Sequence, residues 1–597
     1  MPAAPPPRFR SVADPRWSPA GGRCGWIEET AEGPSHLHLA RPDGSDRVRV
    51  EPAARRTPPT WGGTWSWCGE EAVVLVAADG RLLRVDLADG SPSEIRPADG
   101  ARVLAPVASP DGRWVACAVE TASAQRIEVL GIAGRPSQVV STADFAWDPV
   151  WSPSGDALAW HEWDHPHMPW DGSRVVVAPV RDGVVGARSV VAGGPDEQVG
   201  QPRWSPDGMH LAWVSDADGW LRVWIADAQG RDARPLAVDL HEAAEAPWGA
   251  GQRSYAWSPD SRSIVWCRNE DGFGALVRAA LDEPDEVDPV ARAWHHGIDA
   301  GPHGVVAIRS GARTPPRVVV HAPDGTRTEI AHGDPPGFTA DDLVEPEVLR
   351  WAGDGGPVTG LLYRPAGVER PPVLVDCHGG PTGAATVRWI ADVADLVARG
   401  WAVLRPNPRG STGSGRAHLR ALDGRWGSAD VDDVVVGIEA MRARPDLDGG
   451  RTAICGGSAG GMLALLVALR RPDLVRACAV SYAVTDLRDL AAVDYRFEQH
   501  YTERLVGPLP AHEATYLERS PITYASGLRV PTLMVHGDAD PVVPIEQMRA
   551  FADRARAAGA PVEVHEYPGE GHGWSRPETV ADADARLVGF LEREVLG

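Results

Sequence analysis

A short turn motif recurs through the first half of the chain, and its spacing limits the possible folds more than any other feature. In its fullest form the motif is Trp-Ser-Pro-Asp-Gly followed by a few alternating apolar residues. Full or partial copies begin at positions 17, 65, 108, 151, 204, 257 and 299, so neighbouring copies are 42 to 53 residues apart. Sequence repeats of about this length, each with several short strands, are typical of β-propellers.

The motif suits a tight turn that leads into a strand. In the copy at 204, Pro206 fixes φ, Asp207 and Gly208 favour the next turn positions, and residues 210–214 alternate as a strand does. A pair of β-sandwiches is the alternative, but sandwiches do not repeat at a fixed period. We therefore predict a seven-bladed β-propeller over residues 1–335, with the repeated tryptophans in its core. The first residues are candidates to pack on the following domain instead.

The pattern changes in the polar, Pro- and Gly-containing stretch 331–342, which we interpret as a linker. Beyond it, apolar strand-like runs alternate with helix-like runs, which predicts a doubly wound, mostly parallel α/β sheet over residues 336–597. The expected strands are 372–376, 401–405, 452–455, 529–535 and 562–566, and the expected helices are 386–399, 429–444, 461–470, 544–557 and 579–594. Such sheets carry their chemistry at the carboxyl ends of the strands.

Composition excludes several classes of function. A chain of 597 residues is too long to fold around a single hydrophobic core, so we expect two large domains. The net charge of -23 disfavours nucleic acid and anionic membranes as partners. The chain has no lysine, which rules out Schiff-base chemistry, a P-loop and a Ser–Lys dyad. Seven scattered cysteines without a C-x-x-C pair predict neither disulfides nor a zinc ribbon. With no apolar signal-like segment near residue 1, we expect a cytoplasmic protein.

The segment 456–461, Gly-Gly-Ser-Ala-Gly-Gly, carries the strongest chemical signal. It fits G-x-S-x-G and lies between a predicted strand and a predicted helix. This is the setting of a nucleophile elbow, in which a tight turn exposes the serine hydroxyl at the start of a helix. We therefore predict Ser458 as a nucleophile and an α/β-hydrolase domain around it.

An elbow serine needs an acid and a histidine later in the chain, in that order. Asp538 and Asp540 both follow the predicted strand 529–535, and from the residues alone either one fits. His572, between two glycines after the strand 562–566, is the predicted base, whereas His565 lies inside that strand and is assigned to structure.

Two backbone amides are expected to bind the developing oxyanion. One belongs to Ala459, which follows the nucleophile. The other belongs to the loop His378-Gly379-Gly380-Pro381 after an earlier strand, with Gly380 preferred and Gly379 as the alternative. His378 itself is assigned to structure.

The second half resembles the prolyl oligopeptidase family of serine peptidases, in particular its acylaminoacyl-peptidase and dipeptidyl-aminopeptidase-like branch. The matching stretches are VDCHGGPTG, NPRGSTGSGR, RWGSADVDDV, CGGSAGG, SYAVTDL, RLVGP, HGDADPVVP and GEGHGW. The resemblance implies that the triad acid is Asp540. It also implies hydrolysis of short peptides near their N-termini, as an aminopeptidase, dipeptidyl-peptidase or acylaminoacyl-peptidase does. Ala459 and Pro408 depart from residues that are common in the family, which leaves substrate specificity open.

Several further residues are weaker candidates. Tyr482, Phe497 and Tyr501 follow the elbow and could form a substrate pocket, although core packing explains each equally well. Glu242 and Glu245 resemble the glutamate pair with which related dipeptidyl peptidases bind a substrate's amino group, although a solvated acidic loop is the simpler interpretation. His161, His165 and His167 have the irregular spacing of a loop, and we predict no metal and no cofactor.

Three interpretations of function follow. The preferred one is a serine peptidase for short peptides. The second is an amidase or esterase for an aminoacylated small molecule, which would use the same triad. The third is a non-catalytic propeller scaffold, against which the Ser, Asp and His in chain order argue. A homo-oligomer is neither indicated nor excluded.

Overall fold

The computed structural model of the chain describes residues 10–597 except 31–32, 56–62, 336–339, 341–342 and 494. The chain divides into two compact units, with Phe9–Pro335 in one and Pro336–Gly597 in the other. The expectation that the first residues pack on the second domain concerns residues 1–9 and lies outside the described part.

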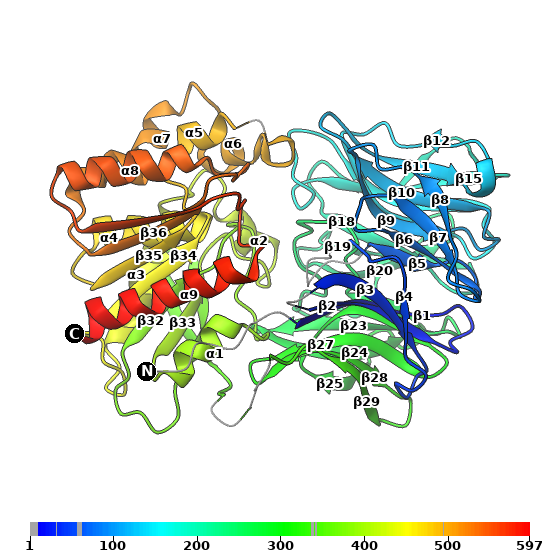
Figure 1. Cartoon of the computed structure of the whole chain (residues 1–597), viewed down its shortest axis with the longest axis horizontal. Coiled ribbons are helices and arrows are strands. Elements are labelled where there is room, and N and C mark those ends of the chain that lie inside the picture. Colours follow the sequence, from blue (N-terminus) through cyan, green and yellow to red (C-terminus); the bar gives the residue numbers. More distant parts are fainter. Residues whose placement is uncertain (1–9, 31–32, 56–62, 336–339, 341–342, 494) are drawn as a thin grey trace. The chain divides into compact units, whose positions relative to one another are not determined.

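The first unit is a seven-bladed β-propeller, as the repeat predicts (Figure 1, blue to green). Each blade is one antiparallel sheet of consecutive strands, and the first strand of each blade lies at one edge of its sheet. The blades are β1–β4 (Arg10–Trp17, Cys24–Thr30, Gly33–Ala40, Val48–Val50), β5–β8 (Trp65–Trp67, Ala72–Val76, Leu82–Asp86, Pro92–Arg96), β9–β12 (Arg102–Ala108, Trp114–Glu120, Gln125–Gly131, Gln138–Val139), β13–β17 (Phe145–Trp151, Ala157–Trp163, Ser173–Arg181, Val184–Val185, Ser189–Gly194), β18–β21 (Val199–Trp204, His210–Ser215, Arg222–Asp227, Arg234–Pro235), β22–β25 (Tyr255–Trp257, Ser263–Glu270, Phe273–Ala280, Val287–Arg292) and β26–β29 (Trp294–Gly301, Gly304–Gly311, Thr314–His321, Arg327–His332).

The repeated tryptophans lie in the first strand of a blade, all but Trp65 at the end of that strand, and they are buried. Trp65 is fully inaccessible, and Trp17, Trp151, Trp204 and Trp257 are at most 9% exposed. The prediction that they belong to the core is therefore confirmed. Four of them also donate the indole N–H to a backbone carbonyl of a neighbouring blade, in the pairs Trp17–Gly304, Trp65–Asp14, Trp151–Val107 and Trp257–Arg203, each 3.1 Å long.

A second repeated feature lies three residues before the motif and was not predicted. Here the first strands bulge, and a residue other than glycine adopts a left-handed backbone conformation, with φ from 45° to 54°. A proline follows it in every case. The four residues are Asp14, Ala105, Asp148 and Gln201. The motif is therefore longer than the Ser-Pro-Asp-Gly turn suggests.

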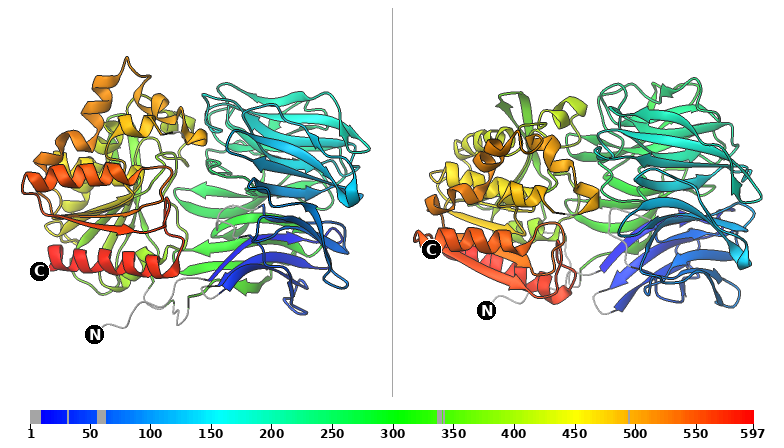
Figure 2. Two further views of the ribbon diagram at one scale, coloured as in Figure 1. Left: turned by 45° about the horizontal axis from the view of Figure 1, so that its top comes forward. Right: turned by 90° about the horizontal axis from the view of Figure 1, so that it is seen from above.

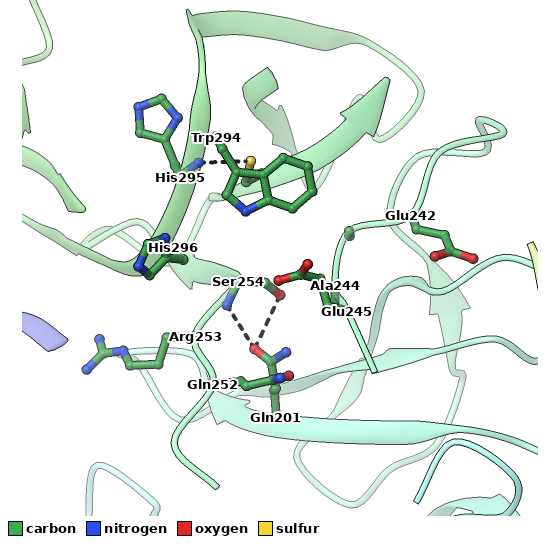
Figure 3. Close-up of a pocket in the computed structure, with 12 residues that line it drawn as sticks. Gln201, Glu242, Ala244, Glu245, Gln252, Arg253, Ser254, Trp294, His295 and His296 are labelled. Carbon is green, nitrogen blue, oxygen red and sulfur yellow. Dashed lines mark hydrogen bonds between the residues drawn. The ribbon is translucent and has the colours of Figure 1, made fainter. Parts of the chain in front are cut away.

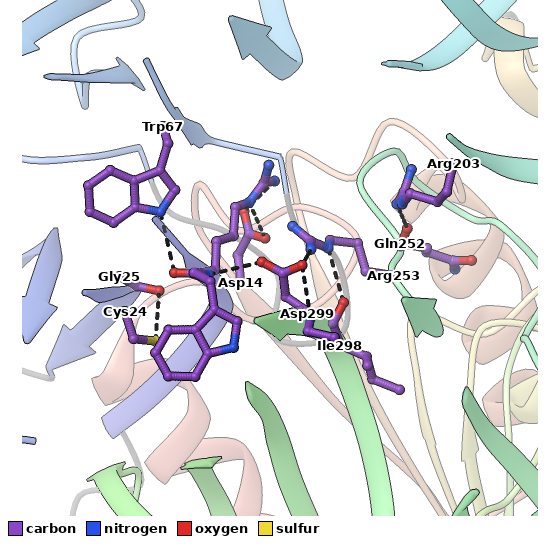
Figure 4. Close-up of polar contacts among 12 residues, drawn as sticks. Asp14, Cys24, Gly25, Trp67, Arg203, Gln252, Arg253, Ile298 and Asp299 are labelled. Atoms are coloured by element: carbon purple, nitrogen blue, oxygen red, sulfur yellow. Dashed lines mark hydrogen bonds and ion pairs between the residues drawn. The ribbon is translucent and has the colours of Figure 1, made fainter. Parts of the chain in front are cut away.

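The ring closes by side-chain contacts, because the first and last blades share no strand. Val12 and Trp26 of the first blade pack in one apolar cluster with Val306 and Val318 of the last. The carboxylate of Asp299 adds a polar clasp (Figure 4): it accepts the backbone N–H of Trp17 at 2.9 Å and pairs with the Arg253 guanidinium at 2.8 Å. Asp299 thus connects the last blade to both of its neighbours.

The second unit is an eight-stranded sheet in the order β30-β31-β33-β32-β34-β35-β36-β37, with helices on both faces (Figures 1 and 2). From β33 onward the strands are parallel, and β30 and β31 are added antiparallel at one edge. The strands β30–β37 are Glu347–Gly353, Gly356–Tyr363, Val373–Cys377, Ala402–Asn407, Thr452–Gly457, Ala477–Ser481, Thr532–Gly537 and Val562–Tyr567. The helices α1–α9 are Ala391–Ala398, Arg416–Arg420, Ala429–Arg442, Ala459–Arg470, Leu487–Ala491, Tyr501–Val506, Glu513–Arg519, Ile545–Ala557 and Pro577–Leu591.

This is the predicted α/β-hydrolase sheet, with differences in detail. The strands β30, β31 and β35 were not expected, and α1 begins at Ala391 rather than at 386. β29 continues to His332, so the linker starts later than residue 331, and part of the linker lies outside the described residues. Within the described part of the chain, no helix has the length and apolar character needed to cross a membrane.

Candidate active site

Ser458 lies between β34 and α4 in a strained turn. Its φ is 55° and its ψ is -125°, which is unusual for a residue with a side chain. The flanking glycines have no space for a side chain: a Cβ on Gly456 would meet Gly460 at 2.5 Å, and one on Gly460 would meet the Cys377 carbonyl at 2.2 Å. The G-x-S-x-G pattern is therefore a steric requirement of this turn.

His572 and Asp540 extend from Ser458 in one hydrogen-bonded chain. The Nε2 atom of His572 lies 3.0 Å from Ser458 Oγ, and its Nδ1 lies 2.8 Å from Asp540 Oδ2. A carboxylate only accepts, so Nδ1–H donates to Asp540 and Nε2 accepts from the serine hydroxyl. This tautomer is the one that can take a proton from Ser458.

The loop after β36 holds the Asp540 carboxylate ionised. The N–H groups of Val542 and Val543 donate to its Oδ1 at 2.8 and 2.9 Å, and His536 Nε2 lies 3.3 Å from Oδ2. Burial acts to raise the pKa of Asp540, but the hydrogen bonds from His536 and His572 outweigh it and hold the pKa well below its usual range.

Asp538, which the residues alone left as an equal alternative, has a different partner. Its Oδ1 accepts the backbone N–H of Gly569. It therefore ties the loop after β36 to the loop that precedes His572, whereas Asp540 contacts the imidazole.

The proposed oxyanion loop passes directly beside the serine. β32 pairs with β34 in parallel, so the loop after Cys377 and the elbow leave the sheet at the same edge. A Cβ on Gly379 would lie 3.7 Å from Ser458 Cβ, and Gly380 has a φ of 125°, which favours glycine. Ala459 is the first residue of α4, where a backbone N–H has no partner within the helix.

Two of the three aromatic candidates, Tyr482 and Tyr501, contact residues that form or border this site. The ring of Tyr482 packs on the His572 ring at 4.7 Å between centroids, and burial raises the pKa of Tyr482 to about 12. Tyr501 is 4% exposed; its hydroxyl donates to Thr382 Oγ1 at 2.7 Å and accepts the Thr382 N–H at 3.1 Å. Tyr501 therefore braces the loop that carries Gly380 and Gly379. Phe497 is partly exposed in the 3₁₀ turn before α6.

Glu242 and Glu245 lie in the propeller, where both line one small cavity with Gln201, Gln252 and Trp294 (Figure 3). The cavity volume is about 30 Å³, which matches a single water molecule. Glu242 is only 7% exposed. The glutamates are thus close together, as a pair of binding residues would be, but this cavity is too small for an amino acid.

The histidines at 161, 165 and 167 lie around the end of β14. His161 is 1% exposed, and its ring packs on Trp163 at 5.0 Å, while His165 packs edge-on against Phe145. No group of three or more His, Cys, Asp or Glu side chains within the described ranges is arranged to hold a metal ion.

Sequence reasoning missed one carboxylate near the triad. Glu498 lies in the 3₁₀ turn Arg496–Glu498 between α5 and α6. Burial raises its pKa to about 7, the charge of His572 lowers it, and the charge of Asp540 raises it further. The sequence signal that could have identified Glu498 is its position directly after Phe497, the residue that was considered as a pocket candidate for its aromatic ring.

The fold and this geometry define the chain's class: a β-propeller joined to a serine-hydrolase domain of the α/β type. Residues 386–596 match the sequence profile of the prolyl oligopeptidase family. The C-terminal domain is thus similar to the serine-peptidase domains of that family.

Comparison with individual proteins agrees with this assignment. The chain is 33% identical to the acylamino-acid-releasing enzyme of Sus scrofa over 229 residues, which cover 37% of this chain and only 31% of that enzyme. A puromycin-hydrolyzing peptidase of Mycobacterium tuberculosis has a similar structure, with a TM-score of 0.89 and 29% identity over 99% of this chain and 95% of that one. A puromycin hydrolase structure follows with a TM-score of 0.86 and 26% identity, covering 98% of this chain and 95% of the other.

Proposed function

We propose that the protein is a serine peptidase that cleaves short peptides near the N-terminus through Ser458, His572 and Asp540. The observation that carries the proposal is the unbroken hydrogen-bonded chain from Ser458 Oγ through His572 to Asp540, on a strained elbow. This arrangement is the general solution for activating a serine hydroxyl near neutral pH.

In the proposed reaction, Ser458 Oγ attacks the scissile carbonyl carbon while His572 Nε2 accepts the hydroxyl proton. Asp540 stabilises the resulting imidazolium, and the N–H groups of Ala459 and of Gly380 or Gly379 bind the oxyanion. The C–N bond then breaks, and His572 returns its proton to the leaving amine. Water, activated by the same histidine, hydrolyses the acyl-enzyme and releases the acid.

A second candidate is hydrolysis of an aminoacylated small molecule. It is favoured by the similarity, over nearly the full length, to a protein described as a puromycin-hydrolyzing peptidase. Puromycin carries an amino acid on an amide bond, so an enzyme that removes N-terminal residues from peptides can accept the same bond. The two candidates differ in substrate and share one chemistry.

For location we propose the cytoplasm, because all seven cysteines are buried free thiols.

The test combines a fluorophosphonate probe with a panel of amide substrates. Labelling of the wild type and loss of labelling in Ser458→Ala would establish the nucleophile. Amino-acid p-nitroanilides with free, acetylated and dipeptidyl N-termini, together with puromycin, would then rank the substrate types. No labelling and no amide hydrolysis would contradict the proposal.

A further inference from the structure

The propeller contains a cavity of about 210 Å³ that is formed by several blades together. Residues of β1, β9, β13 and β18 line it, as does the segment just before β22. These strands belong to five different blades, and each pairs only within its own sheet, so the cavity lies where the blades meet around the axis of the ring. Among the described residues, its charged lining side chains are Arg16, Asp148, Arg203 and Arg253.

Two of these arginines occupy a position of the repeat that other blades fill with valine. The position follows the left-handed residue and its proline in the first strand. In chain order the four residues found there are Arg16, Val107, Val150 and Arg203. The backbone has the same role with either side chain, because the carbonyls of Arg203 and Val107 each accept an indole N–H at 3.1 Å. The fold therefore requires this backbone position but not a guanidinium group.

Arg203 is partly buried and has no carboxylate partner in the described part of the chain. Its guanidinium donates to two backbone carbonyls, that of Pro202 at 2.9 Å and that of Gln252 at 3.0 Å (Figure 4). Both acceptors are neutral, so they satisfy hydrogen bonds without balancing the positive charge. A charge that is partly removed from water in this way is costly unless another group of opposite sign approaches it.

The other two arginines have acidic partners and still add positive charge to the cavity wall. Arg16 holds Asp14 through two hydrogen bonds of 3.0 Å, and Arg253 pairs with Asp299 at 2.8 Å. Burial lowers the pKa of Arg253 to about 10; Asp299 raises it, and the charges of Arg16 and Arg203 lower it further. The three guanidinium groups are therefore close enough to repel one another.

Asp148 is the acidic side chain among the described lining residues, and it balances this charge only in part. It is 7% exposed, and its Oδ1 accepts the Gly251 N–H at 2.6 Å. Burial raises its pKa, whereas the charge of Arg203 lowers it. A buried carboxyl of this kind takes up a proton more readily than an exposed one, which leaves the arginines in excess.

We propose that this cavity is an anion-binding site that takes a small oxyanion, a carboxylate or a phosphate, held by Arg16, Arg203 and Arg253. A guanidinium group presents several N–H donors in one plane, which matches the oxygens of either anion. The volume is several times the 30 Å³ of the cavity beside Glu242. The three arginines come from blades that share no strand, so the bound anion would join these blades and stabilise the ring. The inference does not depend on the proposed peptidase function.

The first experiment measures the unfolding temperature of the wild type and of Arg203→Val as sodium phosphate is added, with sodium chloride holding the ionic strength constant. Valine is the residue that two other blades use at this position, so the backbone should be preserved. Phosphate should raise Tm of the wild type in a saturable manner, because a ligand that binds only the folded state stabilises it. The variant should lose most of this rise. A stability loss that is equal with and without phosphate would assign Arg203 to packing and overturn the inference.

A matched control removes an arginine from the same blade but outside the cavity. Arg231 is 70% exposed and pairs with Asp227 at 2.8 Å. Arg231→Val makes the same change of charge, and its Tm should respond to phosphate as the wild type does. A lost response in both variants would show that phosphate acts through the overall charge of the protein, and the site would be abandoned.

Calorimetric titration measures the affinity directly. In Arg203→Val, and in Arg203→Gln, which keeps polar atoms at this position, Kd for phosphate should rise about 10- to 100-fold. Asp148→Asn removes a negative charge and should bind phosphate at least as tightly as the wild type. Titration with acetate then identifies the group: tighter phosphate binding indicates a phosphate ligand and tighter acetate binding a carboxylate, and either result supports the site. No saturable binding of either anion, or weaker binding in Asp148→Asn, would contradict it.

Discussion

The two units of this protein both contain left-handed backbone conformations at residues other than glycine, but they use them differently. In the propeller four of these residues recur at one position of the first strand, namely Asp14, Ala105, Asp148 and Gln201. In the hydrolase domain, Ser458 and Tyr482 have this conformation at positions that do not repeat along the chain, and both contact His572. A strained residue that repeats with the fold serves packing, whereas one that stands alone beside polar side chains indicates a site.

The serines of the two units show the same contrast. Ser205, in a propeller turn, is fully buried, and its hydroxyl donates to Asp207 and accepts the His210 N–H. Its bonding capacity is used within the turn. The Ser458 hydroxyl lies instead against the acceptor nitrogen of an imidazole. The predictions below test whether this difference between repeated and single features separates structure from chemistry.

The largest expected effect is that of Ser458→Ala. It should lower kcat for amide hydrolysis by about 10⁴-fold or more while leaving the fold intact, because only binding and oxyanion contacts remain. Ser205→Ala should cost about 1 kcal/mol of stability and leave kcat near the wild-type value. Steady-state kinetics and thermal unfolding of both variants provide the check. Equal losses of activity would remove the distinction between the two serines.

The two aspartates after β36 should differ by almost as much. Asp540→Asn is expected to lower kcat by about 10⁴-fold, because an amide favours the wrong tautomer of His572 and cannot balance an imidazolium. Asp538→Asn alters the contact with the Gly569 N–H, leaves the acceptor of His572 Nδ1 in place, and should retain most of the activity. The reverse ranking in the same assay would assign the acid to Asp538.

Acidic residues in the two units should also respond differently to pH. Hydrogen bonds from Ser205 and Met209 help to lower the pKa of Asp207 in the propeller, whereas burial raises the pKa of Asp430 on α3 to about 7. The folded state therefore binds the Asp430 proton more tightly than the unfolded chain does. Its stabilising contribution is complete below about pH 4 and is lost as the pH rises towards 7.

Replacing Asp430 by Asn should remove this dependence. Between about pH 5 and pH 8 the wild type should lose about 2 kcal/mol of unfolding free energy relative to the variant, measured by denaturant titration at each pH. Asp432→Asn, at an exposed position on the same helix, is the control and should follow the wild type. A parallel pH dependence in Asp430→Asn would show that this carboxyl is ionised in the folded protein.

The Asp299 contacts that help to close the propeller ring should make a measurable contribution to stability, although a smaller one than a shared strand would make. Asp299→Asn removes the charge that pairs with Arg253 and weakens the acceptor for the Trp17 N–H, at a cost of about 1–2 kcal/mol. Hydrogen exchange should rise in β1 and β26. Asp288→Asn, which affects an exposed pair with Arg278, should leave both strands protected. Unchanged exchange in Asp299→Asn would assign closure to the apolar cluster alone.

The sequence was most informative where a local pattern is enforced by sterics. The Ser-Pro-Asp-Gly turns identified the blades. The glycines around Ser458 identified the elbow, because a larger residue does not fit at those positions. The choice between Asp538 and Asp540 depends on which carboxylate reaches an imidazole 32 residues away in the sequence. The bond between Tyr501 and Thr382 spans 119 residues, and the burial of Asp430 depends on packing around α3. Contacts of this kind leave no periodic trace in the sequence.

The smallest predicted effect concerns the hydrogen bonds between Tyr501 and Thr382, which hold the proposed oxyanion loop. Tyr501→Phe removes a hydroxyl that both donates to and accepts from Thr382, and it leaves the buried Thr382 N–H without its acceptor. The loop that carries Gly380 should then hold its amide less firmly against the developing oxyanion. We expect kcat to fall about 10-fold with little change in KM, because the contact with the oxyanion exists only in the transition state.

A matched control separates this role from simple packing. Tyr516, on α7, is fully buried and donates its hydroxyl to the Gly507 carbonyl at 3.0 Å, away from the Thr382 loop. Tyr516→Phe should lower stability by about 1 kcal/mol and leave kcat intact. Fluorophosphonate labelling should slow in Tyr501→Phe only, since the probe also develops negative charge on an oxygen near Ser458. If the two variants lose kcat equally, Tyr501 contributes to the core in the same way as Tyr516, and the loop is held by its other contacts.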